Sequence, residues 1–89
     1  MAAVGRRPCI REQLEMNDVL DESGSIANEE ALEEIVKAEG AGRVYWEMAH
    51  LFPFASDRFV EYIERSSEQG CERAKVSLQT ALERRARLG

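Results

Sequence analysis

The pattern of apolar and polar positions is clearest between residues 28 and 40. Asn28 belongs to the residue types that cap helix N-termini, and Gly40 to those that end helices. Between them, apolar residues recur at the spacing of one helix face; these are Leu32, Ile35 and Val36. The pattern predicts a helix with one buried stripe and a glutamate-rich outer face.

A shorter pattern precedes this helix. Pro8 suits a first helical position, because its missing N–H would have no partner inside the helix there. Apolar residues follow at helical spacing, namely Ile10, Leu14 and Val19. We expect a helix from about 8 to 20, followed by a polar turn in the segment DESGSIAN.

Two further helices are predicted on either side of Pro53. The residue before a proline avoids the α region, so a helix over about 42 to 52 should stop there. Ser56 is a suitable cap for the next helix. The stripes are Val44 or Tyr45, Met48, Ala49 and Phe52 before the proline, and Phe59, Val60 and Ile63 after it.

Gly70 leaves two alternatives for the rest of the chain. It can end one helix and separate it from a fifth, or lie inside a continuous helix at a cost of about 1 kcal/mol relative to alanine. A continuous helix from 57 to 88 would be roughly 48 Å long, so its end would protrude from a domain of this size.

The last segment carries a narrow, alanine-rich stripe, followed by arginines at the end where the helix dipole favours cations. Such a stripe fits close packing against a second helix, from the same chain or from a second copy. We expect it to mediate self-association as a homodimer. Its members are Cys71, Ala74, Leu78, Ala81 and Leu82.

The fold class follows from these elements. β-Branched residues are few and do not alternate with polar ones, so no strand is predicted. With 89 residues, 44% of them hydrophobic and 33% charged, the chain has room for one core. We expect an all-α, small, compact bundle of four to five helices, with a last helix that is long and protruding if Gly70 lies inside it. Residues 1–89 would be a single helical domain, with 1–7 flexible.

Composition also bears on location and chemistry. No apolar run is long enough for a membrane helix, and the N-terminal residues lack the apolar stretch of a signal peptide, so a cytoplasmic protein is expected. Cys9 and Cys71 are expected to be semi-buried free thiols. His50 is the only histidine and no CxxC occurs, so we expect no metal site, no cofactor and no catalytic residues.

The net charge of −5 is unevenly distributed. Residues 1–11 hold three arginines and no acid, whereas residues 12–41 hold ten acids against Lys37 alone. Residues 71–89 hold five basic residues against two acids. An acidic front half and a basic tail favour charged partners or head-to-tail self-contact.

Two segments of the chain are similar to known motifs. DESGSIANEEAL resembles an EF-hand calcium loop with Gly24 at its sixth position, but Val19 replaces the leading aspartate. A helix-turn-helix could join residues 29–39 to a recognition helix over 43–52, but that helix offers only Arg43 to phosphates and follows a glutamate-rich helix. The basic tail is a further alternative for nucleic-acid contact. Direct nucleic-acid binding is therefore a secondary hypothesis.

By elimination, the leading hypothesis is a protein–protein interaction module that blocks a basic, nucleic-acid-binding partner surface. Inhibitor, antitoxin, immunity and anti-defence proteins, including anti-CRISPR proteins, are similar in being small, acidic and helical. All six aromatic residues lie between 45 and 62, where some could anchor a partner. The predicted partner-binding residues are Asp18, Asp21, Glu22, Glu29, Glu30, Glu33, Glu34, Tyr45 and Trp46.

Overall fold

The computed structural model describes residues 8–88, which form five α-helices connected by short turns and one longer loop. No β-strand occurs in this part of the chain, where Leu20 and Ile26 form only an isolated bridge. The all-α prediction is confirmed. The expected flexibility of residues 1–7 concerns positions outside the described range. The helices are α1 (Ile10–Met16), α2 (Glu29–Glu39), α3 (Ala41–Ala49), α4 (Asp57–Glu68) and α5 (Glu72–Leu88).

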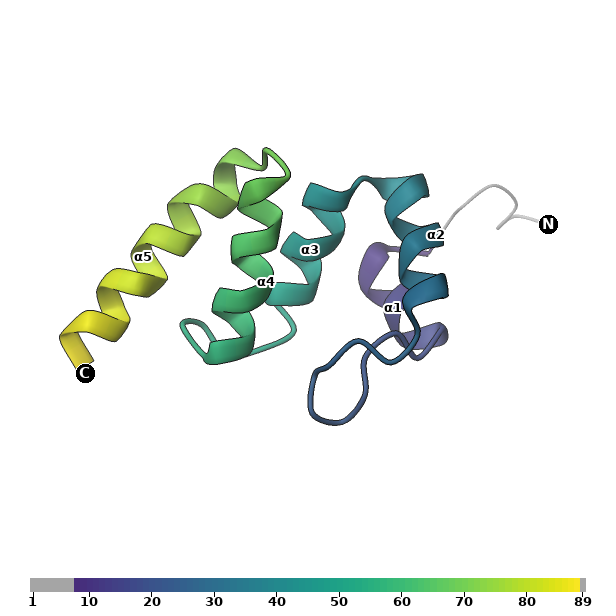
Figure 1. Cartoon of the computed structure of the whole chain (residues 1–89), viewed down its shortest axis with the longest axis horizontal. Helices are drawn as coiled ribbons and strands as arrows, with labels where there is room; N and C mark the ends of the chain where they lie inside the picture. Colours follow the sequence, from purple (N-terminus) through teal and green to yellow (C-terminus); the bar gives the residue numbers. More distant parts are fainter. Residues whose placement is uncertain (1–7, 89) are drawn as a thin grey trace.

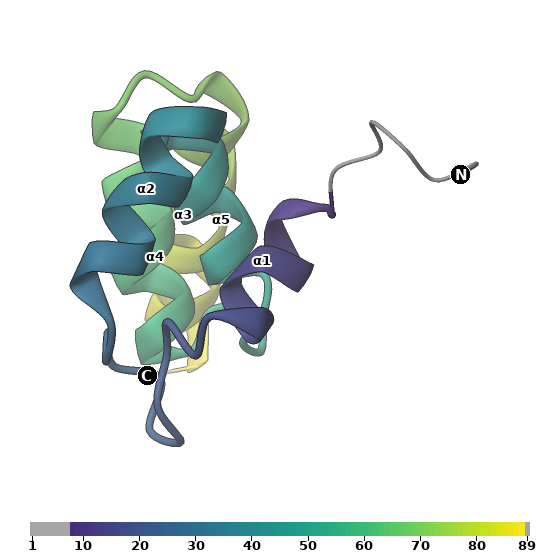
Figure 2. The same ribbon diagram turned by 90° about the vertical axis from the view of Figure 1, so that its right-hand side faces the viewer.

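Helix α3 lies at the centre of the arrangement. It packs on α4 on one side and on α2 and α1 on the other, while α5 packs on α4 (Figure 1). Seen from the α2 end, α2 stands in front of α3 and α1 lies beside it (Figure 2). This order along one direction gives an elongated molecule of 51 × 27 × 22 Å.

The core follows the predicted stripes in part, because Phe52 and Val60 are only half-buried and Tyr62, which was not predicted, is almost fully buried. Val44, Met48 and Ala49 of α3 are fully buried, and they meet the buried Phe59 and Ile63 of α4. Burying such side chains stabilises a fold by about 1.5–3 kcal/mol each, so the α3–α4 contact is the main source of stability.

Helix α1 is shorter than the predicted span of 8 to 20. It begins after Cys9 and ends at Met16, because Asp18 adopts a left-handed conformation with φ of 49°. The N–H of Val19 then donates to the carbonyl of Leu14, and that of Asp18 to the carbonyl of Glu15. These two bonds form a Schellman motif, which stops the helix and buries Val19 against the core.

Helix α3 also ends before its predicted limit at residue 52. Its last helical residue is Ala49, and the chain continues through tight turns in which Leu51 N–H donates to Met48 and Phe52 N–H to Ala49. Helix α4 starts as predicted, with the Ser56 hydroxyl accepting from the N–H of Phe59 at 3.3 Å.

Gly70 separates α4 from α5. Its φ of 92° is left-handed, and the N–H groups of Gly70 and Cys71 return to the carbonyls of Ser67 and Ser66. The geometry is a second Schellman motif, so the continuous helix is wrong and the helix-ending alternative is right. At 17 residues α5 is still the longest helix, and every described residue after Ala81 is exposed.

Candidate protein-binding groove

An open groove of about 480 Å³ runs between α2 and α4, with the start of α3 as its floor. It exists because α3 separates α2 from α4, which have no extensive contact with each other in the described chain. Its surface is mainly apolar and combines side chains from the loop and three helices. The lining residues are Ile26, Glu29, Leu32, Glu33, Val36, Lys37, Ala41, Tyr45, Arg65 and Gln69.

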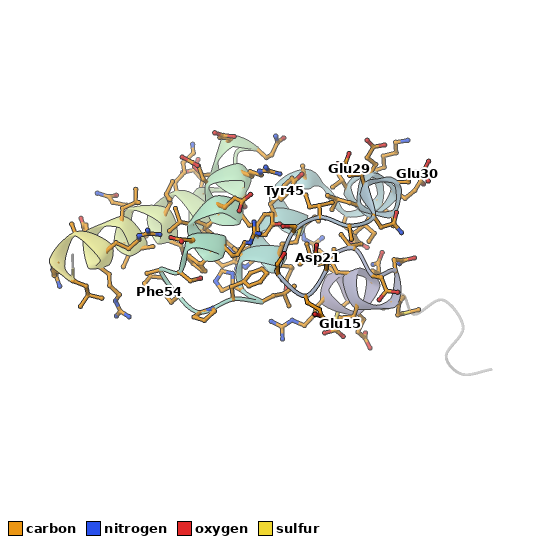
Figure 3. The ribbon with its side chains drawn as sticks, turned by 60° about the horizontal axis from the view of Figure 1, so that its bottom comes forward. Glu15, Asp21, Glu29, Glu30, Tyr45 and Phe54 are labelled. Carbon is orange, nitrogen blue, oxygen red and sulfur yellow. The ribbon has the colours of Figure 1, made fainter. Side chains whose placement is uncertain are left out.

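One rim of the groove is acidic. Glu29 and Glu33 are exposed and lie one turn apart on α2, and Figure 3 shows Glu29 near Tyr45. Within residues 8–88, neither carboxylate makes an ion pair or a side-chain hydrogen bond. Asn28 caps the helix just before Glu29, its side chain accepting from Ala31 N–H at 3.1 Å. The rim therefore presents two uncompensated negative charges beside apolar surface.

The two basic residues of the groove each have an acidic partner. Arg65 lies 3.7 Å from Glu61, a carboxylate that it shares with Arg58 at 2.8 Å, and its guanidinium lies over the ring of Tyr45. Lys37 lies 3.8 Å from Glu34 on the exposed surface of α2. Glu29 and Glu33 have no partner in the described chain, so the unpaired charge at the α2 rim of the groove is negative.

The loop between α1 and α2 is held against α4 by hydrogen bonds. The Tyr62 hydroxyl donates to the Gly24 carbonyl at 2.6 Å. Arg58 adds two bonds, from Nε to the Ser23 carbonyl at 3.1 Å and from Nη2 to the Ser25 hydroxyl at 2.7 Å. These contacts hold the loop that carries Ile26, and with it the start of α2, in place.

Asp21 organises the same loop from within. Its Oδ1 accepts from the Ser23 hydroxyl at 2.7 Å and from the N–H groups of Ser23 and Ser25 at 2.9 and 3.0 Å. These bonds favour the charged form and lower the pKa of Asp21, the Ser23 hydroxyl contributing most. The carboxylate is thus used as an internal cap of the turn.

The calcium-loop alternative gains no support from this geometry. Val19, at the first loop position, is fully buried, and Glu30, at the twelfth, lies on the outer side of α2. Over residues 8–88, no three His, Cys, Asp or Glu side chains come together in a way that could hold a metal ion. The loop is a hydrogen-bonded turn between two helices.

The structure brings together only part of the predicted partner-binding set. Glu29, Glu33 and Tyr45 meet at the groove, where Tyr45 is half-buried. Glu30 and Glu34 are exposed on α2 but do not line the groove, and Trp46 lies under the guanidinium of Arg73 at 4.7 Å. The remaining acids are exposed in or beside the loop before α2: Asp18, Asp21 and Glu22.

Sequence reasoning missed the apolar part of the groove. Val36 was assigned to the buried stripe of α2, yet it is half-exposed and lines the groove. Ile26 and Ala41 carried no signal of their own, and Arg65 and Gln69 come from a helix distant in sequence. The one available hint was the width of the α2 stripe, because Val36 lies on the same face as Glu29 and Glu33.

The alanine-rich stripe of α5 has a partner within the chain. Ala74 and Ala81 are fully buried against α4, and Cys71 and Leu78 are half-buried against the core. Leu82 alone among the five predicted self-association residues is classed as exposed, at 49%. Self-association itself stays a prediction, and a second copy would have to use Leu82 rather than the alanines.

The basic tail is largely engaged with the rest of the molecule. Arg85 pairs with Asp57 at 2.8 Å, Lys75 lies 3.3 Å from Glu72, and Arg84 lies over the ring of Phe54. With Arg73 over Trp46, four of the five basic side chains of α5 have contacts, which leaves little free positive surface for nucleic acid.

The helix-turn-helix alternative meets a geometric difficulty. The proposed recognition helix is α3, and only Arg43 on it is exposed. A recognition helix must present a full face to the major groove, whereas α3 is covered by its neighbours on both sides. The turn before it consists of Gly40 alone, shorter than the usual three or four residues.

The two cysteines are free thiols, and the histidine contacts Trp46. Both cysteines are free, with Cys9 exposed and Cys71 half-buried, so the expectation of semi-burial is wrong for Cys9. His50 has its Nδ1 2.8 Å from the Trp46 carbonyl, and its ring lies against the Trp46 ring at an interplanar angle of 37°. None of the helices in residues 8–88 has the length and apolar character needed to cross a membrane.

Comparison of the chain with models of protein families, with curated proteins and with solved structures gives no match.

Proposed function

We propose that this protein is an interaction module of the inhibitor type, which binds a basic surface of a partner protein and thereby blocks that surface from nucleic acid. The observation that supports this proposal is the set of exposed carboxylates on α2. In the described chain Glu29, Glu30 and Glu33 have no ion-pair partner, so their charge is available to another molecule.

Electrostatic complementarity explains what these carboxylates would contribute. Charged surfaces steer the encounter with a partner of opposite sign and exclude partners of the same sign, while single exposed ion pairs add little affinity. Most of the affinity would come from apolar contacts, which the groove beside Glu29 and Glu33 supplies.

The proposal includes a cellular location and a mode of action. An antitoxin-like or anti-CRISPR-like protein acts in the cytoplasm on a nucleic-acid-binding protein or complex, and it requires no chemistry of its own. The acidic rim would repel phosphates, so the protein would compete with nucleic acid rather than bind it.

The test is an affinity purification of the tagged protein from its native lysate, with and without nuclease, analysed by mass spectrometry. We expect one basic protein to be recovered in both samples. Recovery that disappears with nuclease would contradict the proposal and point to nucleic acid as the ligand.

A charge-reversed variant makes the test specific. Replacing Glu30, Glu33 and Glu34 together with lysine should abolish recovery without unfolding the protein. The matched control reverses Glu64, Glu68 and Glu83, which are equally exposed on α4 and α5, and should retain the partner. If the α2 variant keeps both its fold and its partner, the acidic face serves solubility alone and the proposal is wrong.

A further inference from the structure

We infer that the groove between α2 and α4 is the receptor for a basic amphipathic helix of the partner protein. This inference rests on the proposed function and adds the conformation and chemistry of the segment that binds. Apolar side chains of the partner helix would lie on Leu32, Val36 and Tyr45, and its lysine or arginine side chains would meet Glu29 and Glu33.

The dimensions suit two turns of helix. Glu29 and Lys37, which mark the two ends of the α2 rim, are eight positions apart and so about 12 Å apart along the helix axis. Apolar residues spaced as i, i+4 and i+7 span about 10.5 Å, slightly less than this length. The volume of about 480 Å³ lies within the range of protein ligand sites.

The walls of the groove favour a helix over an extended segment. An extended peptide needs backbone donors and acceptors beside it, as a sheet edge provides, since its own N–H and C=O groups are unsatisfied. In the described chain the groove is bounded mainly by α2, α3 and α4, whose backbone groups are bonded within each helix except in the end turns, so no continuous row of free donors and acceptors lies along it. A helix satisfies its own backbone and requires only side-chain contacts.

Charge selects which helix binds. Glu29 and Glu33 have no partner in the described chain, whereas Lys37 is paired with Glu34 and Arg65 shares the carboxylate of Glu61 with Arg58. An acidic helix would meet like charge at the α2 rim, and a purely apolar one would leave the rim carboxylates beside apolar surface. A basic amphipathic helix complements both the rim and the floor.

The probe is a fluorescein-labelled synthetic peptide of about 18 residues, long enough for measurable helicity, with leucine on one face and lysine on the other. Two control peptides are a scrambled sequence of the same composition, which has no apolar face, and a version with glutamate in place of lysine. Binding is measured by fluorescence anisotropy at physiological salt. Shifts in the amide NMR spectrum locate the site.

Two pairs of matched variants distinguish binding in the groove from binding to the acidic surface in general. Glu29→Lys with Glu33→Lys changes the rim, and an outer pair, Glu64→Lys with Glu83→Lys, makes the same change in charge at exposed positions outside the groove. Ala41→Trp fills the groove, whereas Ala38→Trp places the same side chain on exposed surface outside it.

We expect the amphipathic peptide to bind and to shift Leu32, Val36 and Tyr45. The rim pair should weaken binding about tenfold more than the outer pair, and Ala41→Trp should weaken it by a similar factor relative to Ala38→Trp. Equal binding of the scrambled peptide, or equal effects of the two glutamate pairs, would overturn the groove inference and leave the acidic-surface function standing. If the native partner is lost from the variant with Glu30, Glu33 and Glu34 replaced by lysine but is retained by Ala41→Trp, the groove inference is likewise wrong and the acidic-surface function still stands.

Discussion

The hydroxyl of Tyr62 donates a 2.6 Å hydrogen bond to the carbonyl of Gly24, across 38 positions of sequence. Tyr62 is almost fully buried in α4, and Gly24 lies in the loop that leads into α2. The bond therefore connects α4, which packs on α3 in the core, to the loop that positions α2 and the groove rim. Stability and the proposed binding site depend on the same contact.

Replacing Tyr62 with phenylalanine tests this contact. The ring remains, but the Gly24 carbonyl loses its donor in a buried position, so we expect the free energy of unfolding to fall by about 1–2 kcal/mol. Urea denaturation followed by circular dichroism gives the value. Tyr45→Phe is the control, because the Tyr45 hydroxyl has no hydrogen bond in the described chain. Equal stability of Tyr62→Phe and the natural protein would show that the bond contributes nothing.

Gly24 is required for a second reason. Its φ of 89° is left-handed, and a Cβ placed there would lie 2.8 Å from Cε1 of Phe52. Gly24→Ala should thus combine backbone strain with a steric clash and cost about 2 kcal/mol or more.

Gly70→Ala is the matched control for Gly24→Ala. Gly70 has a similar φ of 92° but open space around its Cβ position, so only the strain of about 1 kcal/mol is expected. Thermal and urea denaturation of both variants measure the difference. If the two substitutions cost the same, the contact with Phe52 is not tight. Adding Phe52→Leu to Gly24→Ala should recover part of the stability.

The helices were predictable from the sequence because their signals are local. Asn28 and Ser56 cap helices within three residues of themselves, and Gly70 ends α4 through its own left-handed backbone. The early end of α1 was not predicted, since Asp18 is not a glycine and its left-handed conformation depends on Val19 reaching the core. Local sequence signals therefore predict where the helices lie, whereas tertiary packing determines where some of them end.

The groove was predictable only in part. Its acidic rim could be read from the sequence, because glutamates four positions apart share one helix face. Its floor and far wall could not, since Ala41 and Arg65 meet only after α3 has placed α2 and α4 on its two sides. The same applies to Tyr62 and Gly24, whose contact has no counterpart in the pattern of either segment.

Asp21 makes the stability of the folded protein dependent on pH. Its pKa is lowered in the folded protein from the ordinary value of 3.8, so its charged form favours folding. That contribution is present above the unfolded pKa and is lost as the pH falls through the folded pKa. We expect the melting temperatures of the natural protein and of Asp21→Asn to differ at neutral pH and to converge below about pH 4. A constant difference down to low pH would show that the charge of Asp21 has no part in the turn.

Self-association, if it uses α5, should depend on Leu82. Ala74 and Ala81 are buried against α4, so a second copy could reach only the exposed side of the stripe without displacing the helix. We expect a dimer at micromolar concentration in sedimentation equilibrium, and we expect Leu82→Glu to be monomeric because a carboxylate would be buried in the contact. Val76→Glu is the control, since Val76 is 66% exposed and lies outside the predicted stripe. A monomeric natural protein would contradict self-association altogether, whereas a dimer that survives Leu82→Glu would place the contact elsewhere on the surface.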